Sequence, residues 1–91
     1  MIVEITKDNL NDYNIPFEVD LNSEFENNPF ARVLILLEDN KVIGYTYYSD
    51  IYDRVEINQI EVENIHRNSG KGSKLIKYLI DTVDKDITLE V

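Results

Sequence analysis

Cysteine and tryptophan are absent from the 91-residue sequence, and histidine occurs once, as His66. Without cysteine the chain has no disulfide, no cysteine-based zinc site and no cysteine nucleophile. A single histidine excludes a multi-histidine metal centre, and a Ser-His-Asp triad would have to use His66. We therefore expect no metal ion in this protein.

Basic residues are scarce, because nine Lys and Arg stand against 18 Asp and Glu, which gives a net charge of −9. Proteins that bind nucleic acid or anionic membranes nonspecifically need clustered Lys and Arg. We therefore expect neither nucleic acid nor a membrane as a partner. An acidic field instead favours cationic partners such as small amines or basic peptides.

Long hydrophobic runs are also missing. The longest is the run 33–37, whereas a membrane-spanning helix needs about 20 residues. The N-terminus carries Glu4 and Asp8 where a secretory signal would have a basic segment followed by an apolar one. We expect a single domain over residues 1–91. A cytoplasmic location is in keeping with the lack of cysteine.

The first third of the chain is polar and only weakly periodic. Residues 2–5 are a strand candidate, and short helices are predicted near residues 10–13 and 23–27. The middle of the chain has clearer patterns. Segments 32–38 and 42–49 are rich in β-branched, leucine and tyrosine residues, which favour strands.

A turn joins these two strands, since Asp39 and Asn40 tolerate left-handed backbone dihedrals. Residues 54–62 form the third strand of the predicted antiparallel meander. In that strand Val55 and Ile57 share one parity, whereas Ile60 and Val62 share the other. A β-bulge between Ile57 and Ile60 would return all four side chains to one core, although a strand buried on both faces also fits.

Apolar residues recur at helical spacing from residue 73 to about residue 84, and residues 87–91 then alternate as a strand. A strand, a glycine-bearing loop, a helix and a second strand make a βαβ unit. We expect the last strand to run parallel to the strand 54–62 through a right-handed crossover. The predicted fold class is therefore α/β with a mixed sheet.

Two of the three glycines, Gly70 and Gly72, lie in the loop before this helix. Glycines let a ligand approach the backbone closely, and the free N–H groups of a helix N-terminus attract anions, phosphate above all. Within residues 65–80 the charge is inverted, since this segment holds four bases and no acid: Arg67, Lys71, Lys74 and Lys77. These features favour phosphate binding over a plain flexible turn.

The spacing Arg67-x-x-Gly70-x-Gly72 strongly resembles the acyl-CoA pyrophosphate loop of the GNAT superfamily of N-acyltransferases. The order of elements over residues 31–91 resembles that family too. The resemblance implies acetyl-CoA as the acyl donor and direct attack of a primary amine on its thioester. The acceptor would be a small molecule or a peptide.

The resemblance also implies roles for individual residues. The backbone of Ile60, Glu61 and Val62 would pair with the pantetheine arm, and the N–H of Val62 would polarise the thioester carbonyl. The pyrophosphate would be wrapped by the backbone of seven consecutive residues, namely Arg67, Asn68, Ser69, Gly70, Lys71, Gly72 and Ser73.

Two carboxylates are candidates for the base that removes the amine proton. Glu90 matches the position of a proposed base in the ribosomal-protein-alanine acetyltransferase branch of the family, and Glu56 lies on the strand before the bulge. Each also fits an ordinary exposed strand carboxylate. The tyrosines of the second meander strand are interpreted as packing and rim residues: Tyr45, Tyr47 and Tyr48.

The family pattern continues after the last strand of this sequence with a helix and two further strands. We expect a C-terminally short member, with its last strand exposed as a sheet edge that supports a homodimer. Two functions therefore stay open. The first is an acetyl-CoA-dependent N-acetyltransferase, and the alternative is a non-catalytic remnant that binds CoA or a protein partner.

Overall fold

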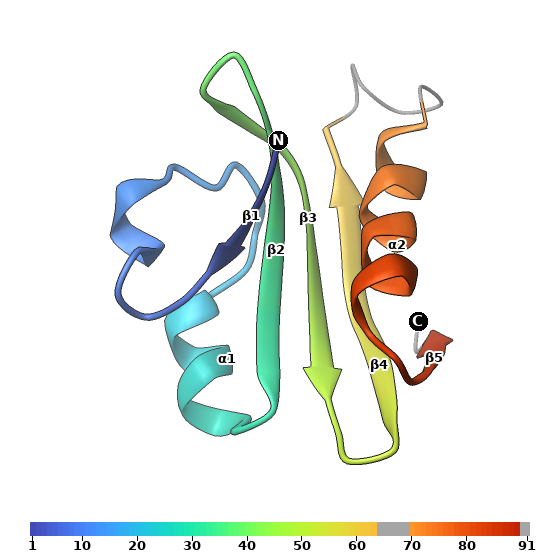
Figure 1. Cartoon of the computed structure of the whole chain (residues 1–91). Helices are drawn as coiled ribbons and strands as arrows, with labels where there is room; N and C mark the ends of the chain where they lie inside the picture. Colours follow the sequence, from blue (N-terminus) through green and yellow to red (C-terminus); the bar gives the residue numbers. More distant parts are fainter. Residues whose placement is uncertain (64–69, 90–91) are drawn as a thin grey trace.

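The computed structural model of the protein describes residues 1–63 and 70–89. Within the described residues, five strands and two α-helices form a mixed α/β fold (Figure 1), which confirms the predicted fold class. In chain order they are β1 (Ile2–Ile5), the 3-10 helix η1 (Leu10–Asp12), α1 (Leu21–Asn27), β2 (Ala31–Glu38), β3 (Lys41–Asp50), β4 (Arg54–Val62), α2 (Lys71–Thr82) and β5 (Asp86–Leu89).

The sheet has the order β1-β2-β3-β4-β5, with antiparallel pairing from β1 to β4 and parallel pairing between β4 and β5. The β2–β3 turn has the predicted left-handed residues, since φ is 52° at Asp39 and 64° at Asn40. Both the antiparallel meander and the βαβ unit are therefore confirmed. None of the helices among the described residues has the length and apolar character needed to cross a membrane.

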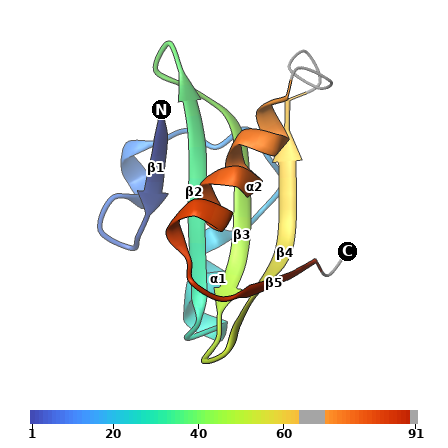
Figure 2. The ribbon, with the colours of Figure 1, turned by 45° about the vertical axis from the view of Figure 1, so that its right-hand side comes forward.

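Each face of the sheet has its own hydrophobic layer. The helix α2 covers one face, and α1 with the segment before it covers the other (Figures 1 and 2). Leu75 and Leu79 of α2 are fully buried, as are Val33 and Ile35 on the opposite side of the sheet. This two-sided burial explains why β2 and β3 read as nearly continuous apolar runs.

The phase slip in β4 is a β-bulge, which is the first of the two interpretations that the parity of its apolar residues left open. Tyr47 pairs with Gln59 and the next residue, Tyr48, pairs with Ile57, so Asn58 is the additional residue of β4. Ile57 before the bulge is buried in the layer under α2, and Ile60 after the bulge packs against the same layer.

The helix α2 differs from its prediction at both ends. It begins at Lys71, two residues earlier than expected, because Gly70 serves as its N-cap with a φ of 79°. It ends at Thr82, because Val83 is extended at its C-cap position. The side chain of Val83 still packs against the core, which is why the apolar pattern extends past the helix.

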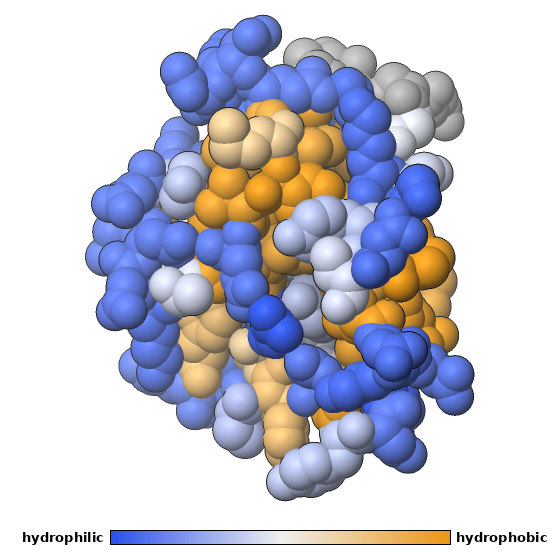
Figure 3. All heavy atoms as spheres, in the orientation of Figure 1, coloured by the Kyte–Doolittle hydropathy of each residue, from blue (hydrophilic) through white to orange (hydrophobic). Residues whose placement is uncertain are grey.

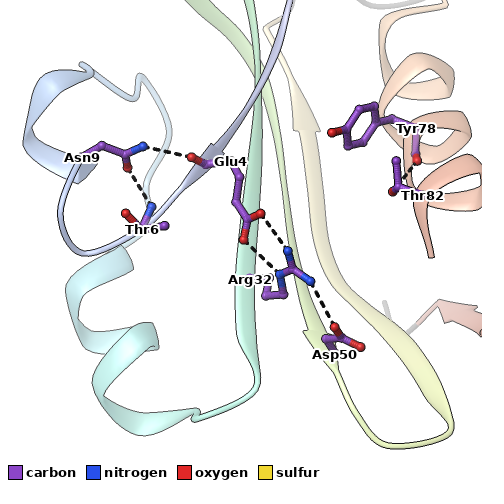
Figure 4. Close-up of polar contacts among 7 residues, drawn as sticks. All are labelled: Glu4, Thr6, Asn9, Arg32, Asp50, Tyr78 and Thr82. Carbon is purple, nitrogen blue, oxygen red and sulfur yellow. Dashed lines mark hydrogen bonds and ion pairs between the residues drawn. The ribbon is translucent and has the colours of Figure 1, made fainter. Parts of the chain in front are cut away.

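An ionic network ties three strands to the connection between α2 and β5. Figure 4 shows its part on the strands, from Glu4 through Arg32 to Asp50. The Arg32 guanidinium donates to both carboxylate oxygens of Glu4, at 2.7 and 3.0 Å, and to Asp50 at 3.1 Å. Lys85 donates to the other oxygen of Asp50 at 2.6 Å and to the carbonyl of Ile51 at 2.9 Å. Hydrogen bonds from Lys85, and then from Arg32, lower the pKa of Asp50.

We predict that Asp50→Asn lowers the free energy of unfolding at pH 7 by about 1–2 kcal/mol, toward the lower end of the range for hydrogen bonds to a charged group because the Asp50 side chain is partly exposed. Because the folded pKa of Asp50 lies below its unfolded value, its stabilisation is complete above the unfolded pKa. It is lost as the pH falls through the folded pKa, below about pH 4. Urea unfolding of both proteins at pH 7 and pH 3 tests this. An undiminished difference at pH 3 would contradict it.

Candidate active site

The N-terminal end of α2 presents backbone donors next to a glycine turn. The first hydrogen bond of the helix runs from the Lys74 N–H to the Gly70 carbonyl, at 3.1 Å. The N–H groups of Lys71, Gly72 and Ser73 precede that bond, so the helix itself offers them no acceptor. Together with the helix dipole, these donors favour an anion at this end of α2.

This turn lies against the end of β4. A Cβ atom built on Gly72 would lie 3.8 Å from Cγ2 of Val62. The structure therefore brings Val62, the last of the predicted strand residues Ile60, Glu61 and Val62, close to Gly72, which is one of the predicted loop residues from Gly70 to Ser73. Three further predicted loop residues lie outside the described residues: Arg67, Asn68 and Ser69.

The bulge divides β4 into two halves with different neighbours. The half before the bulge, from Arg54 to Ile57, pairs with β5, and Leu89 is the last described residue of β5 in this pairing. We call this the lower half of β4 and the part after the bulge the upper half. Figure 2 shows β5 crossing the lower half of β4, away from the upper half that leads to α2. The N–H of Glu63 bonds the carbonyl of Ile43 on β3 at 2.9 Å. Successive residues of a strand point their N–H groups to opposite sides. Because the N–H of Glu63 points toward β3, the N–H groups of Val62 and Ile60 point away from β3.

The charge around α2 is less basic than the local sequence indicates. Lys71 forms an ion pair with Glu38, at the end of β2, and only 17% of the Lys71 side chain is exposed. Lys77 pairs with Asp81 at 3.0 Å. Glu38 is distant in sequence, so the acid-free segment 65–80 gains an acidic neighbour only when the chain folds. Backbone donors are thus the chief anion-binding groups that the described part of the loop offers.

Of the two candidate bases, Glu56 lies in the described part of the chain. It pairs across the sheet with Ser49 and accepts a hydrogen bond from Arg54 at 2.9 Å. That bond raises the pKa of Arg54. The side chain of Glu56 is 18% exposed. Glu90 lies outside the described residues.

Hydroxyl groups of β3 hold the bulge, a feature that the sequence patterns did not predict. The Tyr45 hydroxyl donates to the side-chain oxygen of Gln59, and the Ser49 hydroxyl donates to that of Asn58 at 2.9 Å. Thr46 Oγ1 donates to the main-chain carbonyl of Gln59 at 3.0 Å. The available signal was the series of hydroxyl-bearing residues facing the parity break, but their partners depend on strand register.

The tyrosines of β3 are packing residues, as predicted. Tyr45, Tyr47 and Tyr48 are 1%, 6% and 2% exposed. Burial, followed by the nearby charges of Glu61 and Glu24, raises the pKa of Tyr45 to about 12. Its hydroxyl is therefore protonated at neutral pH and remains a hydrogen-bond donor to the bulge.

The sequence matches the family model described as the acetyltransferase (GNAT) family over residues 2–91. The chain belongs to the GNAT acetyltransferase family. Membership supports acetyl transfer from an acyl-CoA as its general chemistry, in agreement with the resemblance found in the sequence. No curated protein matches the sequence significantly.

Solved structures of GNAT proteins share the fold. The ribosomal-protein-alanine N-acetyltransferase from Brucella melitensis biovar Abortus 2308 superposes with a TM-score of 0.75 at 17% identity, covering 100% of this chain and 80% of that one. The aminoglycoside 6'-N-acetyltransferase from Acinetobacter haemolyticus gives 0.72 at 16% identity, covering 100% and 79%.

A GNAT acetyltransferase from Elizabethkingia anophelis with acetyl-CoA bound gives a TM-score of 0.66 at 21% identity. That alignment covers 88% of this chain and 54% of the other. At these identities the solved structures support the fold. The present chain spans between about half and four fifths of their lengths.

Proposed function

We propose that this GNAT protein is an N-acetyltransferase that moves the acetyl group of acetyl-CoA to a primary amine. The observation that carries the proposal is the contact between the glycine turn of α2 and the upper half of β4, in a chain of this family. Donors for phosphate and a strand for the pantetheine arm then lie side by side. The solved relative with acetyl-CoA bound supports the choice of donor.

In this proposal the backbone of residues 67–73 holds the pyrophosphate, and Ile60, Glu61 and Val62 pair with the pantetheine arm. The N–H of Val62 donates to the thioester carbonyl and stabilises the negative charge that develops on its oxygen. The neutral amine nitrogen attacks the carbonyl carbon, so a C–N bond forms. The C–S bond then breaks and CoA leaves as the thiolate, while a base takes the proton from nitrogen.

Either Glu90 or Glu56 supplies the base in this scheme. Substituting glutamine for each residue in turn shows which of the two carboxylates is the base. We predict that Glu90→Gln lowers turnover near neutral pH by about a hundredfold or more and changes the Kd for acetyl-CoA less than twofold, because a general base acts on the amine rather than on the donor. The matched variant Glu56→Gln should keep its turnover. Loss of turnover in Glu56→Gln alone would assign the base to Glu56.

The proposal is tested by titrating the intact chain with acetyl-CoA in a calorimeter and by assaying release of free CoA thiol with a panel of amines. Binding together with amine-dependent thiol release is the expected result. Binding without thiol release with any amine would favour the non-catalytic CoA-binding alternative. Absence of binding would overturn the enzyme and leave a protein-interaction role.

The acceptor is proposed to be a cationic amine, either small or part of a peptide, because the net charge of −9 attracts it electrostatically. An uncharged or acidic amine should therefore react more slowly. The relatives named above act on ribosomal-protein alanine or on aminoglycosides according to their names. A cytoplasmic location belongs to the same proposal, on the basis of the cysteine-free composition.

We further propose that β5 pairs with β5 of a second copy. Among the described strands β5 is at the edge of the sheet, and Leu89 and Ile80 nearby in sequence are 57% and 59% exposed. Figure 3 shows hydrophobic side chains at the surface around α2. Sedimentation equilibrium should give a mass that rises toward the dimer with protein concentration. Leu89→Lys should shift it toward the monomer, and a constant monomer mass in the wild type would contradict this proposal.

A further inference from the structure

Thr46 carries a hydroxyl in the middle of a hydrophobic layer. It is 0% exposed and pairs across the sheet with Leu34 on one side and Ile60 on the other. Both of these neighbours belong to, or pack against, the layer beneath α2. Burying a hydroxyl among apolar groups is unfavourable unless it is hydrogen-bonded, and valine would fill the same volume without that cost. The hydroxyl must therefore make a hydrogen bond that offsets the cost of burying it.

The hydrogen-bond partner of the Thr46 hydroxyl lies at the β-bulge of β4. Thr46 Oγ1 donates at 3.0 Å to the carbonyl oxygen of Gln59, the residue directly after the additional residue Asn58. The Tyr45 hydroxyl holds the side chain of the same Gln59, so main chain and side chain are fixed from β3. At a bulge the regular ladder of backbone hydrogen bonds is interrupted. A side-chain donor at this point stabilises the bulged register against a regular one.

Ser49 connects the bulge to the end of α1 through two hydrogen bonds. Its hydroxyl donates to the side chain of Asn58, and it accepts a hydrogen bond from Asn28, just after α1, at 2.9 Å. Asn28 also donates to the Tyr47 hydroxyl at 2.9 Å. The bulge is thus fixed from both faces of the sheet. Thr46 is the member of this set that lies under α2, where no substrate can reach its side chain.

We propose that Thr46 is a positioning residue for acetyl-CoA: by holding the Gln59 carbonyl it keeps β4 bulged before the donor binds, so that the strand edge past the bulge is ready for the pantetheine arm. This inference rests on the proposed function. A one-residue slip of β4 would turn Ile60 and Val62 to the other face and redirect their backbone groups. Thr46 would therefore affect binding of the pantetheine arm and leave the phosphate end of the site unchanged.

Three variants separate positioning from general stabilisation. Thr46→Val removes the hydroxyl and keeps the shape, whereas Thr46→Ser keeps the hydroxyl. The matched control Thr82→Val removes a hydroxyl that donates to the Tyr78 carbonyl at 2.7 Å near the end of α2 (Figure 4). For each protein, calorimetry measures the Kd of acetyl-CoA and that of phosphoadenosine diphosphate, the nucleotide half of coenzyme A, which lacks the pantetheine arm. Urea unfolding measures stability.

Thr46→Val is expected to weaken acetyl-CoA binding by about tenfold, the effect of losing the energy of about one hydrogen bond, and to change binding of the nucleotide half less than twofold. Thr46→Ser and Thr82→Val should each stay within about twofold of the wild type for both ligands. Equal weakening of the two ligands in Thr46→Val, or unchanged acetyl-CoA binding, would overturn the proposal.

A measurement without ligand keeps this inference separate from the proposed function. Amide hydrogen exchange in the free protein should be faster in Thr46→Val than in Thr82→Val at residues 59–62, which lie just past the bulge. Unchanged exchange there would show that Thr46 does not hold the bulge. A wild-type chain that binds neither ligand would overturn the proposed function, while the exchange result would still decide whether Thr46 holds β4.

Discussion

Replacing Gly70 with alanine is expected to weaken acetyl-CoA binding by about a hundredfold, which corresponds to losing one or two charge-assisted hydrogen bonds to phosphate. A Cβ built on Gly70 meets no described atom within 4 Å, so it would project into open space at the start of α2. In the proposed complex that space belongs to the pyrophosphate. The methyl group would keep the phosphate away from the backbone donors.

Controls separate this blocking effect from backbone strain. Gly70 has a φ of 79°, which is unfavourable for alanine by about 1 kcal/mol, so Gly70→Ala also loses stability. Asparagine tolerates this conformation better, and Gly70→Asn should lose binding with less loss of stability. Gly72→Ala is the comparison variant: it keeps the Gly72 N–H, and its Cβ would point back toward Val62 at an ordinary contact distance of 3.8 Å, so we expect it to weaken binding far less than Gly70→Ala does.

The measurements are acetyl-CoA titration calorimetry and urea unfolding of the three variants. Wild-type affinity in Gly70→Asn would contradict the placement of the pyrophosphate at this turn. A large loss of affinity in Gly72→Ala would show that the phosphate approaches the other side of the turn, next to Val62.

Replacing Gly44 is expected to destabilise the fold. A Cβ on Gly44 would lie 3.1 Å from the carbonyl oxygen of Glu61, 3.4 Å from Val62 and 3.6 Å from Leu75. It would thus meet the main chain of β4 and the buried face of α2 together. Overpacking of this kind costs about 1–3 kcal/mol, whereas removing a strand glycine returns only about 0.5–1 kcal/mol. The unfavourable contact is therefore the larger effect, and replacing Gly44 lowers the free energy of unfolding.

We predict a loss of about 1 kcal/mol for Gly44→Ala and about 3 kcal/mol for Gly44→Val, because the second side chain adds two further methyl groups to the same contact. Both variants should also weaken acetyl-CoA binding, by roughly tenfold for alanine, since Glu61 and Val62 must shift to make room. Urea unfolding and calorimetry measure the two effects. Unchanged stability in Gly44→Val would contradict the close packing of β3, β4 and α2 at this position.

Much of the fold could be predicted from local patterns. Period-two and helical spacing, together with the left-handed tolerance of Asp39 and Asn40, predict the meander and the βαβ unit correctly. The predicted boundaries of α2 were wrong by two residues at each end, because Gly72 weakens the helical pattern at the start and Val83 extends it at the end. Caps depend on backbone dihedrals, which apolar periodicity does not report.

The candidate site was predictable where it depends on adjacent residues. The glycine turn, the basic loop and the parity break in β4 are all visible in one short stretch of sequence. The ion pair between Lys71 and Glu38 was not predictable, because it joins residues 33 positions apart. The hydroxyl anchors of the bulge were not predictable either, since their partners depend on the register of β3 against β4.

The lack of cysteine, the single histidine, the scarcity of basic residues and the glycine-rich loop are properties of the sequence by itself. They determine which chemistry this protein excludes and which family it resembles. The tertiary structure decided which groups meet: the glycine turn with Val62, Glu38 with Lys71, and Thr46 with the carbonyl of Gln59. The physical reason is that periodicity specifies a face within one element, whereas contacts between elements require the register and packing of the whole sheet.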